Sequence, residues 1–482
     1  MHAGLLLLAI SLHAADLDRR LDALLQSAPA NARAFVGIHV VHLATGKTLY
    51  RLNDDRLFVP ASNMKLLTAA VALTRLGPDY RFTTNVHQTS SGDLVLTGSG
   101  DPSLSGRVYP YSKDKPAGPP LQAIDDLADQ AVAKGLRVVA GDIVGDDRLY
   151  PWAPYPPNWA IDDALREYGA PVSALTVADN VVRVSIQPGA EPGDLAILSL
   201  APALEYYAID NRVETIAAPE RGKPAETRIR VSRQLGSRQL LLWGSIAIGH
   251  APVVEELAID DPALYAALAF RDALERRGVM ILGSTIARHR SVTGDVEPPE
   301  GTVIATRTSP PLIELLRLAE KVSQNLHSEL LLREVGRVAR RTGTREAGIA
   351  EQAALLAEMG VKVADDARLQ DGSGLSVNAQ LTPRLLTRLL AYMQASKYRV
   401  TWNSLLPVGG EDGTLGKRLC CVASEAARIQ AKTGTLNRAV ALSGYADAAR
   451  GRLAFSILVN NFAASQREVR QWIDKIALAL LE

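Results

Sequence analysis

Residues 60–73 read PASNMKLLTAAVAL, and the interpretation of the whole chain starts from this stretch. A proline and a serine followed by apolar, helix-favouring residues indicate the start of a helix. Lys65 follows Ser62 by three positions, so a helix would place both side chains on one face near its positive end. This arrangement is that of a serine nucleophile with a lysine base. Taken alone, a helix-capping serine followed by a solvated lysine is the simpler interpretation.

Length and composition set the frame for this stretch. A chain of 482 residues is too long for one core and suggests about three domains. Its 47% apolar and 22% charged residues are typical of a globular protein, and the net charge of +1 gives no reason to expect nucleic acid as a partner. It contains no apolar run of 18 residues, so no transmembrane helix is expected, and peripheral membrane association stays open.

The N-terminus has two interpretations. Residues 4–12 are apolar and small residues follow, which predicts a signal peptide over residues 1–15 and export of the protein, most simply to the periplasm. Against this, no Lys or Arg precedes the apolar run. The alternative is an apolar start to a helix that runs through Leu17, Leu21 and Leu25.

Neither a metal nor a cofactor is expected. Cys420 and Cys421 are adjacent, so they cannot close a long loop, and they lack further metal ligands at suitable spacing. The eight histidines form no His-x-x-Glu-His or comparable pattern. His327 is expected to be a packing residue rather than a catalytic one.

The two ends of the chain have a similar strand-forming character. Residues 34–43 and 48–51 read as two strands, as do residues 439–445 and 453–459. Residues 466–481 carry one apolar stripe and predict a covering helix. The sequence therefore predicts an antiparallel sheet built from both chain ends and flanked by helices, with the middle of the chain inserted.

The middle of the chain predicts two nested insertions. Helices and strands mix on either side of residues 177–248, which contain several short β-like runs. In the flanking parts, residues 138–144 and 279–286 each read as one strand. The expected fold class is α/β (α+β). The expected division is a first domain of residues 16–85 and 300–482, an inserted α/β domain of residues 86–175 and 250–299, and a nested small β domain of residues 176–249.

Two further triplets change the interpretation of Ser62. Ser323-Gln324-Asn325 interrupts two apolar helical patterns, where it could cap a helix or could supply a proton relay and an amide. Residues 431–435, AKTGT, precede the strand at 439–445 and could lie on an edge strand. There Lys432 and Thr433 would offer an ammonium and a hydroxyl, next to a glycine that a ligand can approach closely.

Ser-x-x-Lys, Ser-x-Asn and Lys-Thr-Gly in this order form the penicillin-binding signature. The chain resembles the class C low-molecular-mass penicillin-binding proteins, the D-Ala-D-Ala carboxypeptidase/endopeptidase family. Ser62 and Ser323 are 261 positions apart, and the family carries its extra domains as an insertion at this place. Gln324 departs from the Asp that is often found there. Further matches are Gly98–Leu104, Asp371–Ser376, Gly413–Leu415 and Leu442–Tyr445.

The resemblance implies a role for each motif residue. Ser62 would be the acylated nucleophile, Lys65 its base, and Ser323 the group that passes a proton to the leaving group. The remaining residues would bind substrate: Asn325 the acyl amide, Lys432 and Thr433 the terminal carboxylate, and the backbone N–H of Thr435, together with that of Ser62, the oxyanion. To act as a base, Lys65 needs a lowered pKa, for which the charge of Lys432 is expected to be the main cause, aided by burial and the helix dipole.

In related enzymes an inserted domain contacts the free amino end of a diaminopimelate side chain. The segment 159–168 resembles that pocket wall, which makes Asp162, Asp163 and Tyr168 candidate substrate-binding residues. An acidic first turn of a surface helix explains the two acids equally well. Val377 stands where some relatives carry Arg, so the sequence leaves the polarity of the leaving-side or side-chain pocket open.

The resemblance implies a serine D,D-peptidase that forms an acyl-enzyme and takes peptidoglycan peptides and β-lactam antibiotics. Carboxypeptidase and endopeptidase action are not distinguished, because the two differ only in the leaving group. One alternative is a serine β-lactamase or esterase of the same fold. The other is a non-catalytic cell-wall-binding protein, which the intact motifs disfavour.

Overall fold

The structure is a computed structural model, and it describes residues 17–29, 33–218, 227–295, 297, 300–419 and 423–482. The expected signal peptide over residues 1–15 and the cysteine pair at 420–421 lie outside the described residues. Residues 17–26 form a helix in which Leu17 and Leu21 are buried. The apolar run that would begin this helix in the alternative interpretation also lies outside the described residues.

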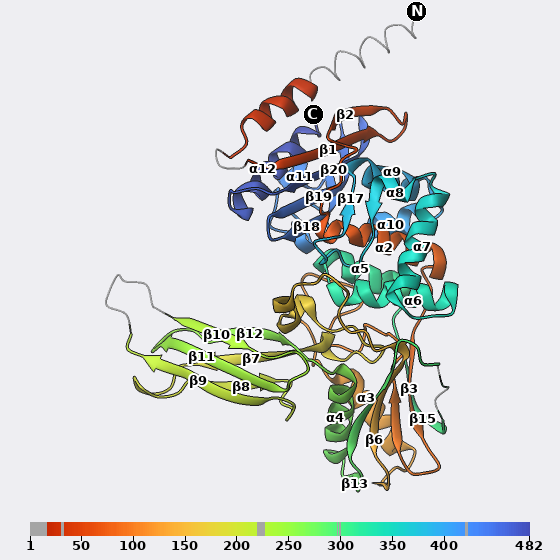
Figure 1. The fold of residues 1–482 in the computed structure, drawn as a ribbon, viewed down its shortest axis with the longest axis vertical. Coiled ribbons are helices and arrows are strands. Elements are labelled where there is room, and N and C mark those ends of the chain that lie inside the picture. The colour runs from red at the N-terminus through yellow and green to blue at the C-terminus, as the bar shows by residue number, and fades with distance from the viewer. Residues whose placement is uncertain (1–16, 30–32, 219–226, 296, 298–299, 420–422) are drawn as a thin grey trace, which may run out of the picture.

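Both ends of the chain build one antiparallel sheet, as predicted (Figure 1). The strand order is β18-β19-β20-β1-β2, with β1 and β20 paired so that Val40 lies opposite Phe455. The strands are β1 (Phe35–His42), β2 (Thr48–Leu52), β18 (Ile429–Leu436), β19 (Ala439–Ala448) and β20 (Gly451–Asn460).

The central strands face a core on each side of the sheet. Successive side chains of a strand point to opposite faces. In β20, Ala454 and Leu458 accordingly pack into one core and Phe455 and Ile457 into the other. A near-continuous apolar strand, in place of an alternating one, is what a sheet covered on both faces requires.

Helices supply both layers. On one face lies α12 (Gln466–Ala479), which begins at the Ser465–Glu468 capping box and packs beside the helix over residues 17–26. On the other face lie the helices of residues 64–76 and 312–405. They are α2 (Met64–Leu76), α5 (Leu312–Val322), α6 (Asn325–Arg340), α7 (Arg345–Glu358), α8 (Val363–Asp366), α9 (Pro383–Ala395) and α10 (Arg399–Leu405). A short α11 (Ala423–Ala426) precedes β18, and β16 (Ala367–Arg368) pairs with β17 (Gln380–Leu381).

A second sheet of mixed direction, in the order β14-β6-β4-β3-β15, lies below the first in Figure 1. Its strands are β3 (Thr83–Gln88), β4 (Leu94–Thr97), β6 (Ile143–Pro151), β14 (Thr285–Arg290) and β15 (Thr302–Thr308). Two helices pack on it, α3 (Gln122–Ala133) and α4 (Pro262–Glu275). The single strands expected over 138–144 and 279–286 are wrong, because turns at Gly141 and Gly283 divide each of them. The first pieces, β5 (Val138–Val139) and β13 (Met280–Ile281), pair with each other.

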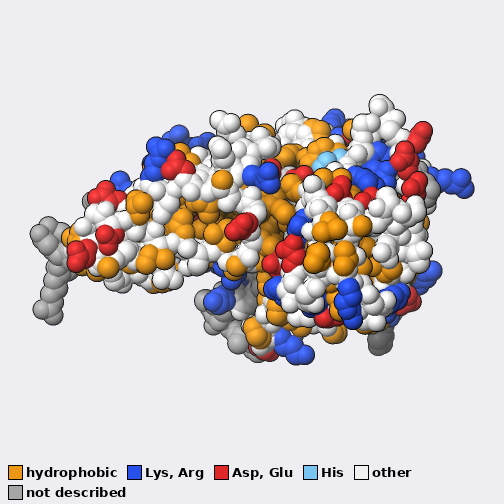
Figure 2. Space-filling model, turned by 90° about the horizontal axis from the view of Figure 1, so that it is seen from below, with side chains coloured by type: hydrophobic (Ala, Val, Ile, Leu, Met, Phe, Trp, Pro, Cys, Tyr) orange, Lys and Arg blue, Asp and Glu red, His pale blue; other side chains and the backbone are white. Residues whose placement is uncertain are grey.

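The third part is all-β, as residues 177–248 indicated, and projects sideways in Figure 1. Two three-stranded sheets share one core to which Val184, Val213 and Leu242 belong. The strands are β7 (Val181–Gln187), β8 (Ile197–Ala201), β9 (Ala208–Ile216), β10 (Arg228–Ser232), β11 (Gln239–Ala247) and β12 (Val253–Ala258). On the face shown in Figure 2, acidic and basic side chains are interspersed with apolar ones.

The predicted domain boundaries stay predictions, and two strands bear on them. β15 pairs with β3 in the second sheet, although residues from 300 onward were assigned to the first domain. β12 pairs with β7 in the third part, although residues from 250 onward were assigned to the second domain. A division by sheets would therefore move these two boundaries past residues 308 and 258.

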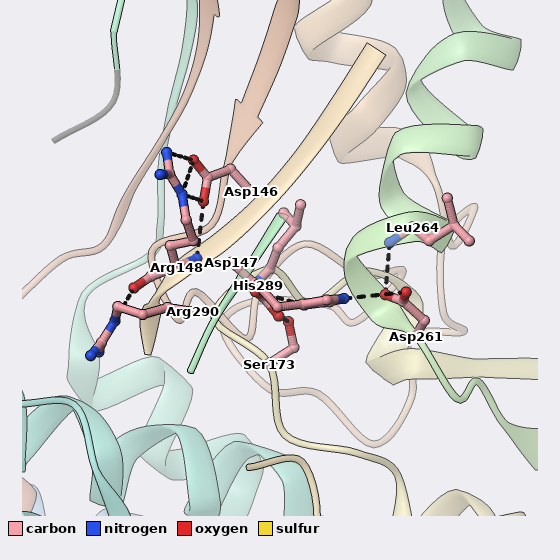
Figure 3. A network of polar contacts seen from close by, with 9 residues as sticks. Asp146, Asp147, Arg148, Ser173, Asp261, Leu264, His289 and Arg290 are labelled. Carbon is pink, nitrogen blue, oxygen red and sulfur yellow. Dashed lines mark hydrogen bonds and ion pairs between the residues drawn. The ribbon is translucent and has the colours of Figure 1, made fainter. Parts of the chain in front are cut away.

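His289 joins strands and helix within the second part (Figure 3). Its Nδ1 lies 2.9 Å from the Asp147 carboxylate and its Nε2 lies 3.3 Å from that of Asp261, which caps α4 through the Leu264 N–H. Its ring stacks on Trp152, with 4.1 Å between ring centroids. Burial lowers the pKa of His289, but the two carboxylates outweigh it and raise that pKa to about 10.

Replacing His289 by glutamine will lower the melting temperature at pH 6 by roughly 2–5 °C, as expected for the loss of charge-assisted hydrogen bonds. Because the folded-state pKa lies above the unfolded value, this stabilisation is complete below about pH 6.5 and is lost as the pH rises towards 10. Calorimetry across this range, with His250→Gln as the control, measures the difference. A difference that stays constant with pH would contradict the ion-pair account.

Candidate active site

Ser62 lies in a single 3₁₀ turn, η1 (Ala61–Asn63), directly before α2. The predicted helix start is therefore a tighter turn that continues as an α-helix. Ala61, just before Ser62, has a φ of 47°. A non-glycine residue in this left-handed region stores strain of about 1–3 kcal/mol, which is common beside reacting groups.

Lys65 is fully buried, and its Nζ makes three contacts. It lies 2.9 Å from Ser62 Oγ, 2.6 Å from Asn325 Oδ1 and 2.8 Å from the carbonyl oxygen of Ser373. The solvated lysine of the simpler interpretation is thus wrong. The amide and carbonyl contacts hold the amine in place, and its third direction points at the serine hydroxyl.

The environment lowers the pKa of Lys65 to about 7. Burial is the largest cause and the positive charge of Lys432 is the second, while three buried acids act in the opposite direction. The sequence-based expectation named Lys432 first, so the order of the two causes is corrected here. Desolvation of an ammonium can shift a pKa by several units, and only the folded structure reveals that burial.

Ser323 and Lys432 form a second pair beside the first. Lys432 Nζ donates to Ser323 Oγ over 2.8 Å, and burial lowers the pKa of Lys432. Ser323 ends α5 in a left-handed conformation with φ of 63°, which turns its hydroxyl out of the helix. Two serine–lysine pairs, one from η1 and α2 and one from α5 and β18, therefore meet at one site.

Gln324 and Asn325 have separate tasks. Gln324 caps α6, its side chain accepting the Leu326 N–H over 2.9 Å. Asn325, beside it, places its Oδ1 on Lys65 and donates from Nδ2 to the carbonyl oxygen of Tyr168 over 2.8 Å. The triplet thus combines the two interpretations of its sequence: its middle residue is a helix cap, and its outer residues face the site.

Edge strand β18 forms a further wall of the site. Thr433 Oγ1 donates to Thr414 Oγ1 over 2.8 Å, whereas Thr435 is exposed. A Cβ on Gly434 would lie 2.8 Å from the carbonyl oxygen of Pro60, so the missing side chain lets β18 lie against η1. The roles of Thr433 and Thr435 in carboxylate and oxyanion binding stay predictions.

The loop over residues 371–376 belongs to the site, although the sequence interpretation gave it no role. It brings the Ser373 carbonyl to Lys65, while Gly374, with φ of 78°, approaches η1 so closely that a Cβ would lie 1.9 Å from the Ala61 oxygen. Two buried acids hold the loop. Asp371 accepts the Gly374 and Ser376 N–H groups, and Glu329 accepts those of Gly372 and Ser373.

Glu320 is a second group that sequence reasoning missed. It lies on α5 and is buried, and its Oε2 has no hydrogen-bond partner among the described residues. Burial raises its pKa, while Lys432 and Lys65 act to lower it. Its place three residues before Ser323, on the same helix face, is the only sequence signal that could have indicated it.

Part of the 159–168 segment lies at the site. The Trp159 indole donates to Asp371 over 3.0 Å, and the Tyr168 carbonyl binds Asn325. The Asp163 carboxylate accepts the Ala160 N–H over 3.2 Å at the start of η2 (Ile161–Leu165). Asp162 is exposed. Binding of a substrate amine by Asp162, Asp163 or Tyr168 stays a prediction.

Two other groups bear on the chemistry. His327 is buried, and its Nε2 lies 3.1 Å from the Asp179 carboxylate. Among the described residues, its ring makes no hydrogen bond to either serine–lysine pair. Val377 is 56% exposed just beyond the 371–376 loop. Within the part of the chain that the structure describes, no group of three or more His, Cys, Asp or Glu could hold a metal ion.

Comparison with known proteins agrees with this geometry. Residues 17–480 match the D-Ala-D-Ala carboxypeptidase 3 (S13) family. The chain is 35% identical to the D-alanyl-D-alanine carboxypeptidase of Actinomadura sp. strain R39, over 97% of this chain and 85% of that protein. It is 22% identical to D-alanyl-D-alanine carboxypeptidase DacB of Haemophilus influenzae, over 90% and 87% of the two chains.

The fold agrees as well. The crystal structure of penicillin binding protein 4 (dacB) from Haemophilus influenzae superposes with a TM-score of 0.81 and 20% identity, covering 95% of this chain and 98% of that one. The predicted fold class and the resemblance drawn from the three motifs are confirmed. The chain belongs to the D-Ala-D-Ala carboxypeptidase 3 (S13) family and is a serine D,D-peptidase.

Proposed function

We propose that Ser62 is the nucleophile and that Lys65 is its general base. The three contacts of the buried Lys65 amine carry this proposal, since they leave the neutral amine directed at Ser62 Oγ. In the first step a bond forms between Ser62 Oγ and the carbonyl carbon of the penultimate D-Ala, while Lys65 takes the hydroxyl proton. The backbone N–H groups of Ser62 and Thr435 stabilise the oxyanion.

In the second step the C–N bond breaks and the leaving amine receives a proton from Ser323. Lys432, 2.8 Å from Ser323 Oγ, replaces that proton. Lys432 and Thr433 also hold the carboxylate of the leaving residue, and Asn325 holds the acyl amide. The proton that Lys65 took then passes to the neutral Lys432, so Lys65 is a free amine again and acts as the base when water hydrolyses the ester at Ser62. Lys65 finally returns that proton to Ser62 Oγ.

The substrate we propose is the peptide part of peptidoglycan, cleaved after D-Ala by carboxypeptidase action, endopeptidase action or both, with β-lactams acylating the same serine. A relative that is 25% identical over 90% of this chain, the penicillin-sensitive carboxypeptidase A of Dictyostelium discoideum, supports the β-lactam part of this proposal. Because peptidoglycan lies outside the cytoplasmic membrane, we place the working protein there, in the periplasm. Among the described residues, no helix has the length and apolarity to cross a bilayer.

Digestion of defined muropeptides tests this function. We expect the purified protein to release D-Ala from pentapeptides or to convert cross-linked dimers into monomers, and to keep a stable adduct with penicillin. Rapid turnover of penicillin with no peptide cleavage would instead show a β-lactamase. Neither cleavage nor an adduct would show a non-catalytic binding protein.

A further inference from the structure

A pocket of about 590 Å³ opens beside Thr433, and no step of the proposed mechanism uses it. Thr414, which accepts the hydrogen bond of Thr433, lines this pocket, as does Val322, the residue before Ser323. Its other wall is the segment 107–117 of the second part, whose Tyr111 hydroxyl accepts the Gly413 N–H over 3.2 Å. The pocket therefore continues from the place where the leaving residue would bind its carboxylate.

The charges around this pocket are unequal. Its lining contains four basic side chains, Arg107, Lys113, Lys115 and Lys417, and two acidic ones, Glu411 and Asp412. The carboxylate of Asp412 is bound by Lys321 over 2.6 Å, from outside the lining. Arg107 is bound in the same way by Asp179 over 2.7 Å.

Lys113 and Lys115 then face one further acidic lining residue, Glu411, so the balance favours an anion. Lys113 and Lys115 are exposed, and Lys113 donates to a backbone carbonyl, that of Glu411, over 3.2 Å, so this contact leaves its charge without a carboxylate. Positive charge along one wall of a cleft concentrates anionic ligands there.

The size of the pocket bears on which anion it takes. A carboxypeptidase releases only D-Ala, whose carboxylate the Lys432–Thr433 site can hold by itself. Pockets of 300–1,000 Å³ accommodate ligands far larger than one amino acid. In a cross-link, by contrast, the leaving amine belongs to a second stem peptide, which carries further carboxylates beyond the one next to the amine.

We infer that the pocket lined by Tyr111, Lys113, Lys115 and Thr414 binds the leaving strand of cross-linked peptidoglycan, an anionic peptide, and so favours endopeptidase action. This inference rests on the proposed function of Ser62 and names the substrate of that same site. The leaving residue's carboxylate lies at Thr433, and the rest of its strand passes Thr414 into the pocket. Lys113 and Lys115 then neutralise carboxylates of that strand.

The test compares two substrates on the full-length protein: a cross-linked muropeptide dimer and an uncross-linked pentapeptide. The measured quantity is the ratio of kcat/KM for the dimer to that for the pentapeptide. We expect the double variant Lys113→Ala with Lys115→Ala to lower this ratio about five- to tenfold, mainly through KM. The double arginine variant, which keeps both charges, should restore it. The matched control replaces two distant exposed lysines, Lys47 and Lys475, by alanine.

Each outcome of this test either supports or overturns the inference. A fall in the ratio that arginine restores, and that disappears for a dimer with amidated carboxylates, supports the inference. A ratio equal to that of the wild type or the control overturns it. A wild-type protein that cleaves no dimer also overturns it, and in that case a penicillin adduct on Ser62 shows that the proposed nucleophile still stands.

Discussion

Replacing Lys65 by arginine will lower the rate of penicillin acylation by roughly 10²–10⁴-fold, the contribution expected of a general base. A guanidinium stays protonated at any accessible pH, so it cannot accept the Ser62 proton. It must also fit where one fully buried amine lies within 2.6–2.9 Å of three acceptors. Stopped-flow measurement with a chromogenic penicillin gives the rate.

The wild-type pH profile belongs to the same prediction. Because only the neutral amine is a base and the pKa of Lys65 is lowered to about 7, acylation should rise with pH through that value and then level off. An exposed lysine would place the rise near pH 10.4. The control Lys47→Arg alters an exposed turn and should follow the wild-type profile. An arginine variant at position 65 that acylated normally would rule out Lys65 as the base.

The second large effect concerns Lys432. Its replacement by methionine will lower kcat/KM for peptides by about 10²–10³-fold, because Ser323 loses its proton donor and the substrate carboxylate loses its counter-charge. Methionine has a similar length and suits a buried site. The pH dependence of acylation should change too. The charge of Lys432 is one cause of the lowered pKa of Lys65, so its removal raises that pKa.

The acidic limb of the acylation profile should therefore move to higher pH in the Lys432→Met variant. The Lys432→Arg variant keeps the charge and should retain the limb near its wild-type position, although its rate will fall if the longer side chain misplaces Ser323. Initial rates of acylation over pH 5–9 distinguish the methionine variant from the arginine variant. An acidic limb that is equal in the methionine variant and the wild type would show that Lys432 does not tune Lys65.

Local patterns explain how far the fold could be predicted. The strands at both chain ends are runs of strand-forming apolar residues and the helix over 466–479 carries one apolar stripe, so the type and position of these elements followed from local sequence. The breaks at Gly141 and Gly283 could not be predicted in this way, since one glycine within an apolar run is compatible with a continuing strand. The pairing of β15 with β3 depends on contacts distant in sequence, which periodicity does not reveal.

The site divides in a similar way. Ser62, Lys65, Ser323, Asn325 and Lys432 are each marked by a motif, and the structure brings all five together. The carbonyl of Ser373 carries no residue-type signal, because any residue has one. Its position depends on the φ of Gly374 and on two buried acids that hold the loop. The burial that dominates the pKa of Lys65 is likewise a property of the packed structure alone.

The central claim is that Ser62 is the residue that becomes acylated, and intact-mass analysis tests it most directly. Wild type and Ser62→Ala are incubated with penicillin, and the adduct is located by peptide mapping. We predict one penicillin mass on the wild type, carried by the peptide that contains Ser62, and none on the alanine variant. An adduct on Ser62→Ala, or one that maps to another residue of the wild type, would contradict the account.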